Sequence, residues 1–227
     1  GSDPQFVLGT DAQGRDMVSA IVYGIRLSVQ VGFSVTLICV VIGTILGLLS
    51  GYKGGRIDAL IMGLINVQLS FPSLLIAMVV LIVFGRGVGK VILALSFSGW
   101  VTYARTVRGA VMGERNKEYV DAAKVLGFSE SRIIFNQILP NVLAPVFVIS
   151  TLQIGNVILS EATLSFLGLG VPITEPSLGL LVSQGYNVLF SGLWWVSVFP
   201  GLVLMLFVVG LNLLGDFLRD EFNPRLK

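Results

Sequence analysis

Long hydrophobic runs dominate this sequence, and glycine, proline and charged residues separate them. The runs lack the alternation of polar and apolar positions that marks a barrel strand, and several exceed the roughly 18 to 20 residues that a helix needs to cross a bilayer. The pattern therefore predicts an all-α polytopic membrane protein with five transmembrane helices. The predicted spans are residues 27–50, 58–84, 88–108, 142–165 and 193–215.

The positively charged residues assign the two sides of these spans. Cytoplasmic loops of membrane proteins carry an excess of Lys and Arg, so the side with more of the 15 Lys and Arg residues is predicted to be cytoplasmic. The eleven residues of the cytoplasmic group are Lys53, Arg56, Arg105, Arg108, Arg115, Lys117, Lys124, Arg132, Arg219, Arg225 and Lys227, and the four of the outer group are Arg15, Arg26, Arg86 and Lys90.

This topology divides the chain into regions. They are an extracytoplasmic segment at 1–26, a transmembrane domain at 27–215 that contains a large cytoplasmic loop at 109–141 and an extracytoplasmic loop at 166–192, and a cytoplasmic tail at 216–227. Ser177 is expected to cap a short amphipathic helix in the extracytoplasmic loop. Because the chain begins outside the membrane without a signal peptide, we expect that a first transmembrane helix has been removed upstream.

A charged stretch, EYVDAAKVLGFSESR at residues 118–132, interrupts this apolar chain and favours helix. Asn116 is a candidate N-cap, and Gly127 suits the left-handed position that follows a helix. Ser129 is expected to cap a second short helix, which Pro140 interrupts before the next span. The cytoplasmic loop is therefore predicted to hold two short helices with a tight bend between them.

The first of these short helices has a small apolar face at helical spacing. The apolar face consists of Tyr119, Ala122, Ala123 and Leu126, and the charged residues outside it are Glu118, Asp121 and Lys124. Small alanine side chains let another surface approach closely. The pattern fits either an ordinary solvated helix or a helix that docks against another protein.

Polar side chains form a stripe in two of the predicted spans. The stripes are Asn66, Ser70 and Ser73 in the second span and Gln153, Asn156 and Ser160 in the fourth. Polar groups that face lipid are costly, so both stripes should face other helices or water. Interhelical hydrogen bonding and the lining of a translocation pathway both remain open, and the ionisable Glu161 is a candidate for either role.

Few residues offer catalytic or metal-binding chemistry. The chain has no histidine and a single cysteine, Cys39, which excludes a Ser-His-Asp triad, a Cys-His pair and a zinc site with histidine ligands. The segment GRGVGKV at 85–91 lacks the first glycine and the Ser or Thr of a phosphate loop. Asp11 and Asp16 could contact a metal or a binding protein outside the membrane, but their spacing fits a capped turn before the first span better. We expect no catalytic residue, metal site, cofactor or nucleic-acid partner.

The charged stretch resembles the EAA loop of the membrane subunits of ABC importers. The resemblance lies in DAAKVLG, followed after nine residues by QILP, with Asp121 where that family usually has Glu and Gln137 where it usually has Ile. It implies that the first short helix couples this chain to an ATP-hydrolysing subunit. The residues implied for this coupling are Glu118, Tyr119, Asp121, Ala122, Ala123, Leu126 and Gly127.

Other segments are similar, more narrowly, to the second permease of oligopeptide, dipeptide and nickel importers. They are LGTDAQGRDMVSAIVYGIRLSVQVG, GWVTYARTVRG, EATLSFLGLGVPITEPSLG and LRDEFNPRLK, and the similarity covers nearly the whole chain. It implies a type I ABC importer permease fold in a bacterial or archaeal inner membrane, with peptides or nickel as substrate. The implied partners are a homologous permease in a heterodimer, two cytoplasmic ATPase subunits that bind ATP and Mg, and an extracytoplasmic solute-binding protein.

Two other functions compete with an ATP-driven importer. A passive channel or facilitator predicts flux without any ATPase, and it gives the charged loop no necessary partner. An intramembrane enzyme needs a nucleophile and a base that face each other at one depth, and the sequence offers no clear base. Co-purification with an ATPase separates the importer from the facilitator.

Overall fold

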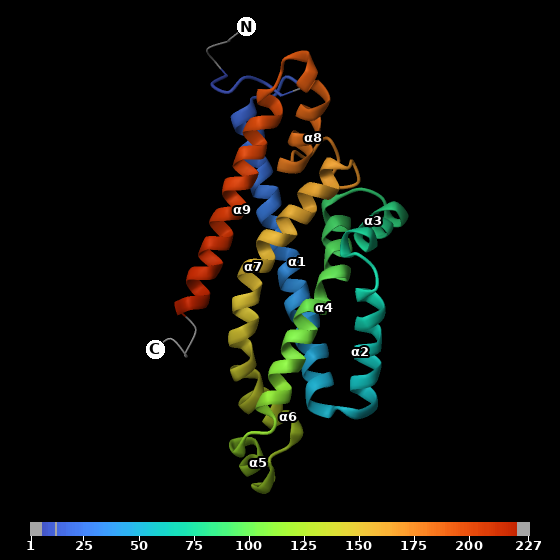
Figure 1. The fold of residues 1–227 in the computed structure, drawn as a ribbon, viewed down its shortest axis with the longest axis vertical. Coiled ribbons are helices and arrows are strands. Elements are labelled where there is room, and N and C mark those ends of the chain that lie inside the picture. Colours follow the sequence, from blue (N-terminus) through green and yellow to red (C-terminus); the bar gives the residue numbers. More distant parts are fainter. Residues whose placement is uncertain (1–5, 12, 222–227) are drawn as a thin grey trace.

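Long helices run side by side in a computed structural model that describes residues 6–11 and 13–221 (Figure 1). The N-terminal segment and α8 lie at one end of the bundle, and α5 and α6 lie at the other. The elements are α1 (Met17–Lys53), α2 (Gly55–Leu69), α3 (Ser73–Phe84), α4 (Val88–Glu114), α5 (Glu118–Val125), α6 (Glu130–Ile133), the π-helical turn η1 (Ile134–Ile138), α7 (Leu139–Phe166), α8 (Leu178–Val188), the 3-10 turn η2 (Leu189–Ser191) and α9 (Trp195–Glu221). The predicted all-α class is confirmed.

Three helical segments of the described chain are long and apolar enough to cross a membrane: α1, Glu130–Phe166 and α9. Together, α2 and α3 meet the same criterion as one broken span. The predicted span 88–108 lies in α4, which does not meet it because polar and charged residues interrupt its apolar run. The predicted count of five spans is therefore confirmed only in part.

A bend of 86° separates α2 from α3, so the predicted span 58–84 is broken into two helices. Pro72 has no backbone N–H and disfavours the helical conformation at Phe71, so α2 cannot continue. The Ser70 hydroxyl donates to the carbonyl of Asn66 (2.9 Å) at the end of α2. Since Ser73 begins α3, it does not share a helix face with Asn66 and Ser70, and that part of the predicted stripe is corrected.

The second helix of the cytoplasmic loop also differs from its prediction. Ser129 caps it as expected, because its hydroxyl accepts from the backbone N–H of Arg132 (3.4 Å). However, α6 continues through η1 into α7, and Pro140 stands in the first turn of α7 instead of interrupting the helix. The π-helical turn, in which the N–H of Leu139 bonds to the carbonyl of Ile134, accommodates the proline within a continuous helix.

The turn before α1 is capped as expected. The Asp11 carboxylate accepts from the backbone N–H groups of Gln13 (2.8 Å) and Arg15 (2.9 Å) and from Nε of Arg15 (2.7 Å). Asp16 is the N-cap of α1 and accepts from the N–H of Ser19 (2.9 Å). The Ser19 hydroxyl and N–H lower the pKa of Asp16 below its ordinary value. The helix begins at Met17, ahead of the predicted span at 27–50.

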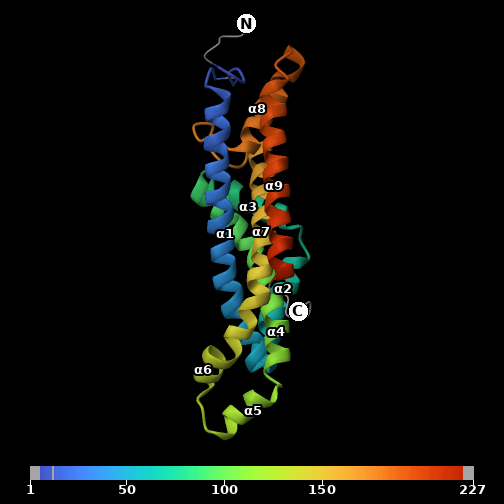
Figure 2. The same cartoon turned by 90° about the vertical axis from the view of Figure 1, so that its left-hand side faces the viewer.

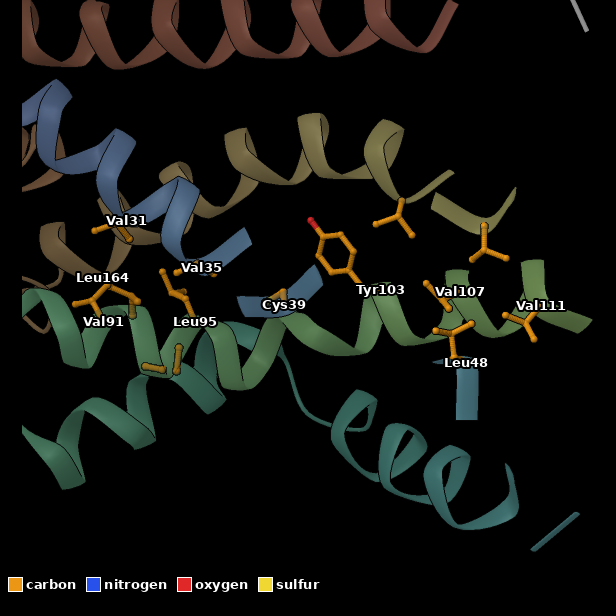
Figure 3. Close-up of a cluster of buried hydrophobic side chains, with 14 of the residues drawn as sticks. Val31, Val35, Cys39, Leu48, Val91, Leu95, Tyr103, Val107, Val111 and Leu164 are labelled. Carbon is orange, nitrogen blue, oxygen red and sulfur yellow. The ribbon is translucent and has the colours of Figure 1, made fainter. Parts of the chain in front are cut away.

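The largest buried cluster lies among α1, α4 and α7 (Figure 3). Tyr103 is fully buried at the centre of this cluster, and its hydroxyl points from α4 toward α7. Cys39 is 2% exposed and fills the role of a small core residue. Three glycines, Gly43, Gly47 and Gly51, line α1 where α4 crosses it, and the close helix contact depends on their lack of side chains.

Candidate functional site

The short helix α5 projects beyond the ends of α1, α4 and α7 (Figure 2). Its C-terminus is a Schellman motif, in which the N–H of Gly127 bonds to the carbonyl of Lys124 (3.0 Å) and that of Phe128 to Ala123 (3.1 Å). Gly127 has φ +77°, as its predicted position requires. The N-cap is Lys117, so the prediction of Asn116 is wrong. Asn116 instead donates to the carbonyl of Met112 (3.2 Å) and satisfies the end of α4.

The inner side of α5 is packed into the protein's own core. Val120 is fully buried and Ala123 is 3% exposed, both within the largest hydrophobic cluster. Tyr119 is half-buried. Its hydroxyl donates a hydrogen bond to the Glu114 carboxylate and accepts one from Nδ2 of Asn141 (3.2 Å). These bonds fasten α5 to the end of α4 and the start of α7.

The electrostatics around Tyr119 follow from these contacts. Partial desolvation raises the pKa of Glu114, but hydrogen bonds from Lys117 (2.6 Å) and Tyr119 and the charge of Lys117 outweigh it, so the pKa lies below its ordinary value. Partial burial and the neighbouring Glu114 carboxylate raise the pKa of Tyr119. Glu114 is therefore ionised and Tyr119 neutral at neutral pH, which preserves their hydrogen bond.

The outer side of α5 is an exposed apolar surface, which we call the α5 patch and which consists of Ala122, Val125 and Leu126. Val125 is 88% exposed and Leu126 is 72% exposed. The structure therefore divides the predicted coupling residues: Tyr119 and Ala123 point inward, whereas Ala122 and Leu126 point outward. Sequence analysis missed Val125, although it lies three residues after Ala122 and hence on the same side.

Two predicted coupling residues are acidic and lie at the start of α5. Glu118 and Asp121 are exposed in its first turn, where the helix dipole favours a negative charge. Asp121 also pairs with Lys124 (2.8 Å) one turn later. The α5 patch is therefore an apolar surface beside a small acidic edge.

A polar cluster near the same end of the bundle was not found from the sequence. Asp58 on α2 binds the guanidinium of Arg108 on α4 through two hydrogen bonds, with Oδ1 to Nε at 2.5 Å and Oδ2 to Nη2 at 2.7 Å. The Ser50 hydroxyl on α1 also donates to Asp58. Arg115 donates to the carbonyl of Gly51 (2.8 Å). The cluster ties α1, α2 and α4 together near the loop that contains α5.

The polar stripe on α7 has the predicted arrangement. Nδ2 of Asn156 donates to Oε1 of Gln153 (2.8 Å), and the Ser160 hydroxyl donates to the carbonyl of Asn156 (2.8 Å). Asn156 is exposed, while Gln153 and Ser160 are half-buried. Asn66, Ser70 and Ser73 are exposed around the bend between α2 and α3. A pathway role for either set stays a prediction.

Glu161 is fully buried among hydroxyl groups from three elements. Its carboxyl accepts from Ser165 on α7 (2.7 Å) and Ser28 on α1 (3.3 Å), and Ser177, the cap of α8, adds a third hydroxyl beside it. Within residues 6–11 and 13–221, no Lys or Arg lies within ion-pair distance of Glu161. This hydroxyl-lined carboxyl connects α1, α7 and α8.

We expect Glu161→Ala to lower the free energy of unfolding by about 1–3 kcal/mol, because it leaves the buried hydroxyls of Ser28 and Ser165 without their acceptor. Glu161→Gln retains the size and an acceptor oxygen, and should lose less than half of that. Thermal unfolding of both variants in detergent measures the difference. Equal melting temperatures for the wild type and Glu161→Ala would show that the carboxyl does not hold the three helices together.

Comparison with known proteins identifies close relatives over the whole chain. Residues 43–227 match the family described as the binding-protein-dependent transport system inner membrane component. The dipeptide transport system permease protein DppC of Haemophilus influenzae is 42% identical over 227 residues, covering 100% of this chain and 77% of the relative. The oligopeptide transport system permease protein OppC of Bacillus subtilis is 37% identical over 219 residues, covering 96% and 72%.

Solved structures with the same arrangement of helices are more distant in sequence. The inward-facing MetNI methionine ABC transporter superposes with a TM-score of 0.72 at 19% identity, over 91% of this chain and 98% of that chain. An amino acid ABC transporter with histidines gives a TM-score of 0.68 at 15% identity, over 90% and 94%. At these identities, the likeness concerns the fold alone.

Proposed function

We propose that this chain, which belongs to the family of inner membrane components of binding-protein-dependent transport systems and is the permease subunit of an ABC importer, carries peptides. The predicted permease fold is confirmed by the structural likeness. The observation that carries the substrate proposal is the identity of 37–42% to dipeptide and oligopeptide permeases over nearly the whole chain. Nickel, the other predicted substrate, gains no support from the described residues, in which no cluster of three metal-ligating side chains occurs.

The pathway is proposed to form between this chain and a second, homologous permease. Exposed polar groups support this arrangement, because Asn66, Ser70, Ser73 and Asn156 are costly in contact with lipid but suit a water-filled path between two subunits. Gln153 and Ser160, half-buried beside Asn156, extend the same stripe along α7. Glu161 is a poor candidate for direct contact with substrate, since it is fully buried.

Coupling to the ATPase is proposed to occur through α5. The α5 patch exposes two large apolar side chains at the tip of the molecule, and such a surface needs a partner. ATP and Mg would be bound by two cytoplasmic ATPase subunits, and this chain would supply no cofactor site. Closure of those subunits would push α5, and its bonds to α4 and α7 would tilt the bundle between inward-open and outward-open states, as in rigid-body alternating access.

The proposed orientation follows from this role of α5. The end that carries α5 and the Asp58–Arg108 pair would face the cytoplasm, together with the C-terminal end of α9. The N-terminal turn and α8 lie at the opposite end, where a solute-binding protein would deliver the substrate (Figure 1). The excess of Lys and Arg in the predicted cytoplasmic segments supports the same orientation. Of the predicted cytoplasmic tail at 216–227, residues 222–227 lie outside the described part of the chain.

Reconstitution tests this proposal. We expect proteoliposomes that contain this chain, its partner permease, the ATPase subunits and the binding protein to accumulate the dipeptide Ala-Ala only when ATP is supplied. Uptake of radiolabelled Ala-Ala and of nickel ions should be compared in the same vesicles. ATP-independent uptake by the permeases alone would favour the passive facilitator, and uptake of nickel without dipeptide would overturn the peptide assignment.

A further inference from the structure

Arg105 projects into a groove between α2 and α4. The groove has a volume of about 390 Å³ and is lined by Leu69, Val101, Thr102, Arg105 and Thr106. Arg105 lies nine residues before the end of α4, which is roughly 13 Å along the helix axis at 1.5 Å per residue. It therefore lies within α4, about one turn before Arg108.

The neighbouring arginines of α4 are bound within the chain, whereas Arg105 is not. Arg108 holds both carboxylate oxygens of Asp58, and Arg115 donates to carbonyls at the end of α1. Across the described residues, no carboxylate lies within ion-pair distance of Arg105 and no acceptor takes a hydrogen bond from its guanidinium. Arg105 is also exposed on α4, so its guanidinium is available to a ligand.

The groove around Arg105 is polar on the α4 side. Thr102 and Thr106 lie on either side of Arg105, and the Thr106 hydroxyl donates to the carbonyl of Thr102 (3.0 Å). Beyond the groove, Gln68 near the end of α2 donates to the carbonyls of Phe97 (2.8 Å) and Ser98 (3.1 Å) and holds the two helices together. A groove that is lined by one guanidinium and two threonines, and by no acidic side chain, suits an anion.

We propose that Arg105 binds the C-terminal carboxylate of the peptide during its passage. This inference rests on the proposed function, since a peptide is the anion-bearing substrate. A guanidinium presents two parallel N–H donors to a carboxylate, which gives a bidentate, charge-assisted pair stronger than a neutral hydrogen bond. The groove is thus a carboxylate site within the pathway, and it selects peptides that have a free C-terminus.

Chemical rescue of an Arg105→Cys variant tests the site in the reconstituted complex. Uptake of Ala-Ala should fall about tenfold or more, the loss expected when a hydrogen-bonded charge is removed. The cationic reagent 2-aminoethyl methanethiosulfonate should restore much of the uptake, while the neutral methyl reagent and the anionic sulfonatoethyl reagent should not. Excess Ala-Ala should also slow the modification of the cysteine, because the peptide occupies the same groove.

Specificity for the carboxylate is tested with the C-terminal amide of Ala-Ala at high concentration. The ratio of acid to amide uptake should fall in Arg105→Cys relative to the wild type, and the preference of the binding protein cancels in this comparison. An equal loss for both peptides, or loss of the assembled complex on size exclusion, would overturn the proposal and point to a pair between Arg105 and the partner permease.

Two controls keep the chemistry interpretable. The chain with Arg105 intact, treated with the same reagents, reports modification elsewhere in the complex. Met112→Cys, on the same side of α4 and 38% exposed, should transport normally before and after cationic modification. If the Arg105→Cys variant takes up Ala-Ala at the same rate as the wild type, the carboxylate site alone is overturned. If the wild type takes up no dipeptide, the proposed function itself is overturned.

Discussion

Gly47→Leu is expected to disrupt the contact between α1 and α4 and to give the largest loss of stability of any single change proposed for this chain. A Cβ at Gly47 would lie 2.6 Å from Cβ of Val107 and 2.7 Å from the carbonyl oxygen of Ala104. The first atom is a side-chain carbon bonded directly to the α4 backbone and the second is a backbone atom, so neither can rotate away. Overpacking typically lowers the free energy of unfolding by about 1–3 kcal/mol, and Gly47→Leu should reach or exceed the upper end of this range.

The two helices cannot separate locally to relieve this clash. Added Cβ atoms at Gly43 and Gly51, one turn away on either side, would also lie within 3 Å of α4 atoms, so the whole crossing is tight. A shift of α4 would also disturb the buried Tyr103 and the Asp58–Arg108 pair. We therefore expect a large drop in the amount of monodisperse protein and in its melting temperature, measured by size exclusion after heating in detergent.

Gly63→Leu is the matched control. No atom lies within 4 Å of a Cβ at Gly63, which is exposed on α2. Its melting temperature should stay the same or rise slightly, because glycine is a poor helix former. Similar melting of the two leucine variants would show that the glycines of α1 do not determine how closely α4 packs.

Val125→Asp combined with Leu126→Asp is expected to remove the ATPase from the purified complex while the permease remains folded. Both side chains are largely exposed, so aspartate is tolerated in the isolated chain. In the proposed complex, both would lose apolar burial worth roughly 1.5–3 kcal/mol each, and new charges would enter the contact. Recovery of ATPase should fall about 100-fold or more, as measured by quantitative immunoblotting after affinity purification.

Two further variants separate docking from folding. Phe190→Asp changes another side chain that is 94% exposed, and it should leave ATPase recovery unchanged. Phe190 belongs to η2, which directly follows α8, and α8 lies at the end of the bundle opposite α5 (Figure 1). Ala123→Asp places a charge in the buried side of α5 and should lower the melting temperature of the permease itself. Full recovery of ATPase with both α5 patch residues changed would show that α5 is not the main coupling surface.

Local features of the chain were predictable because they depend on neighbours in the sequence. Long apolar runs predicted the helical class, and the polar loop predicted α5. Gly127, Ser129 and Ser177 occupy the predicted cap positions, since a cap requires a specific residue type beside a specific backbone geometry. Errors arose where two local signals competed: Asn116 bonds back to α4, and Pro140 is accommodated in a continuous helix by a π-helical turn.

The sequence by itself determined the helical class, the charge distribution and the membership of the family, because composition, spacing and sequence similarity are properties of the linear chain. Only the tertiary structure decided which side of α5 is buried, that Arg108 is paired with Asp58 while Arg105 has no ion-pair partner among the described residues, and that Glu161 joins Ser28 and Ser165. These contacts join residues that lie far apart in the chain. They depend on the rotation and crossing of packed helices, which the spacing within any one helix does not specify.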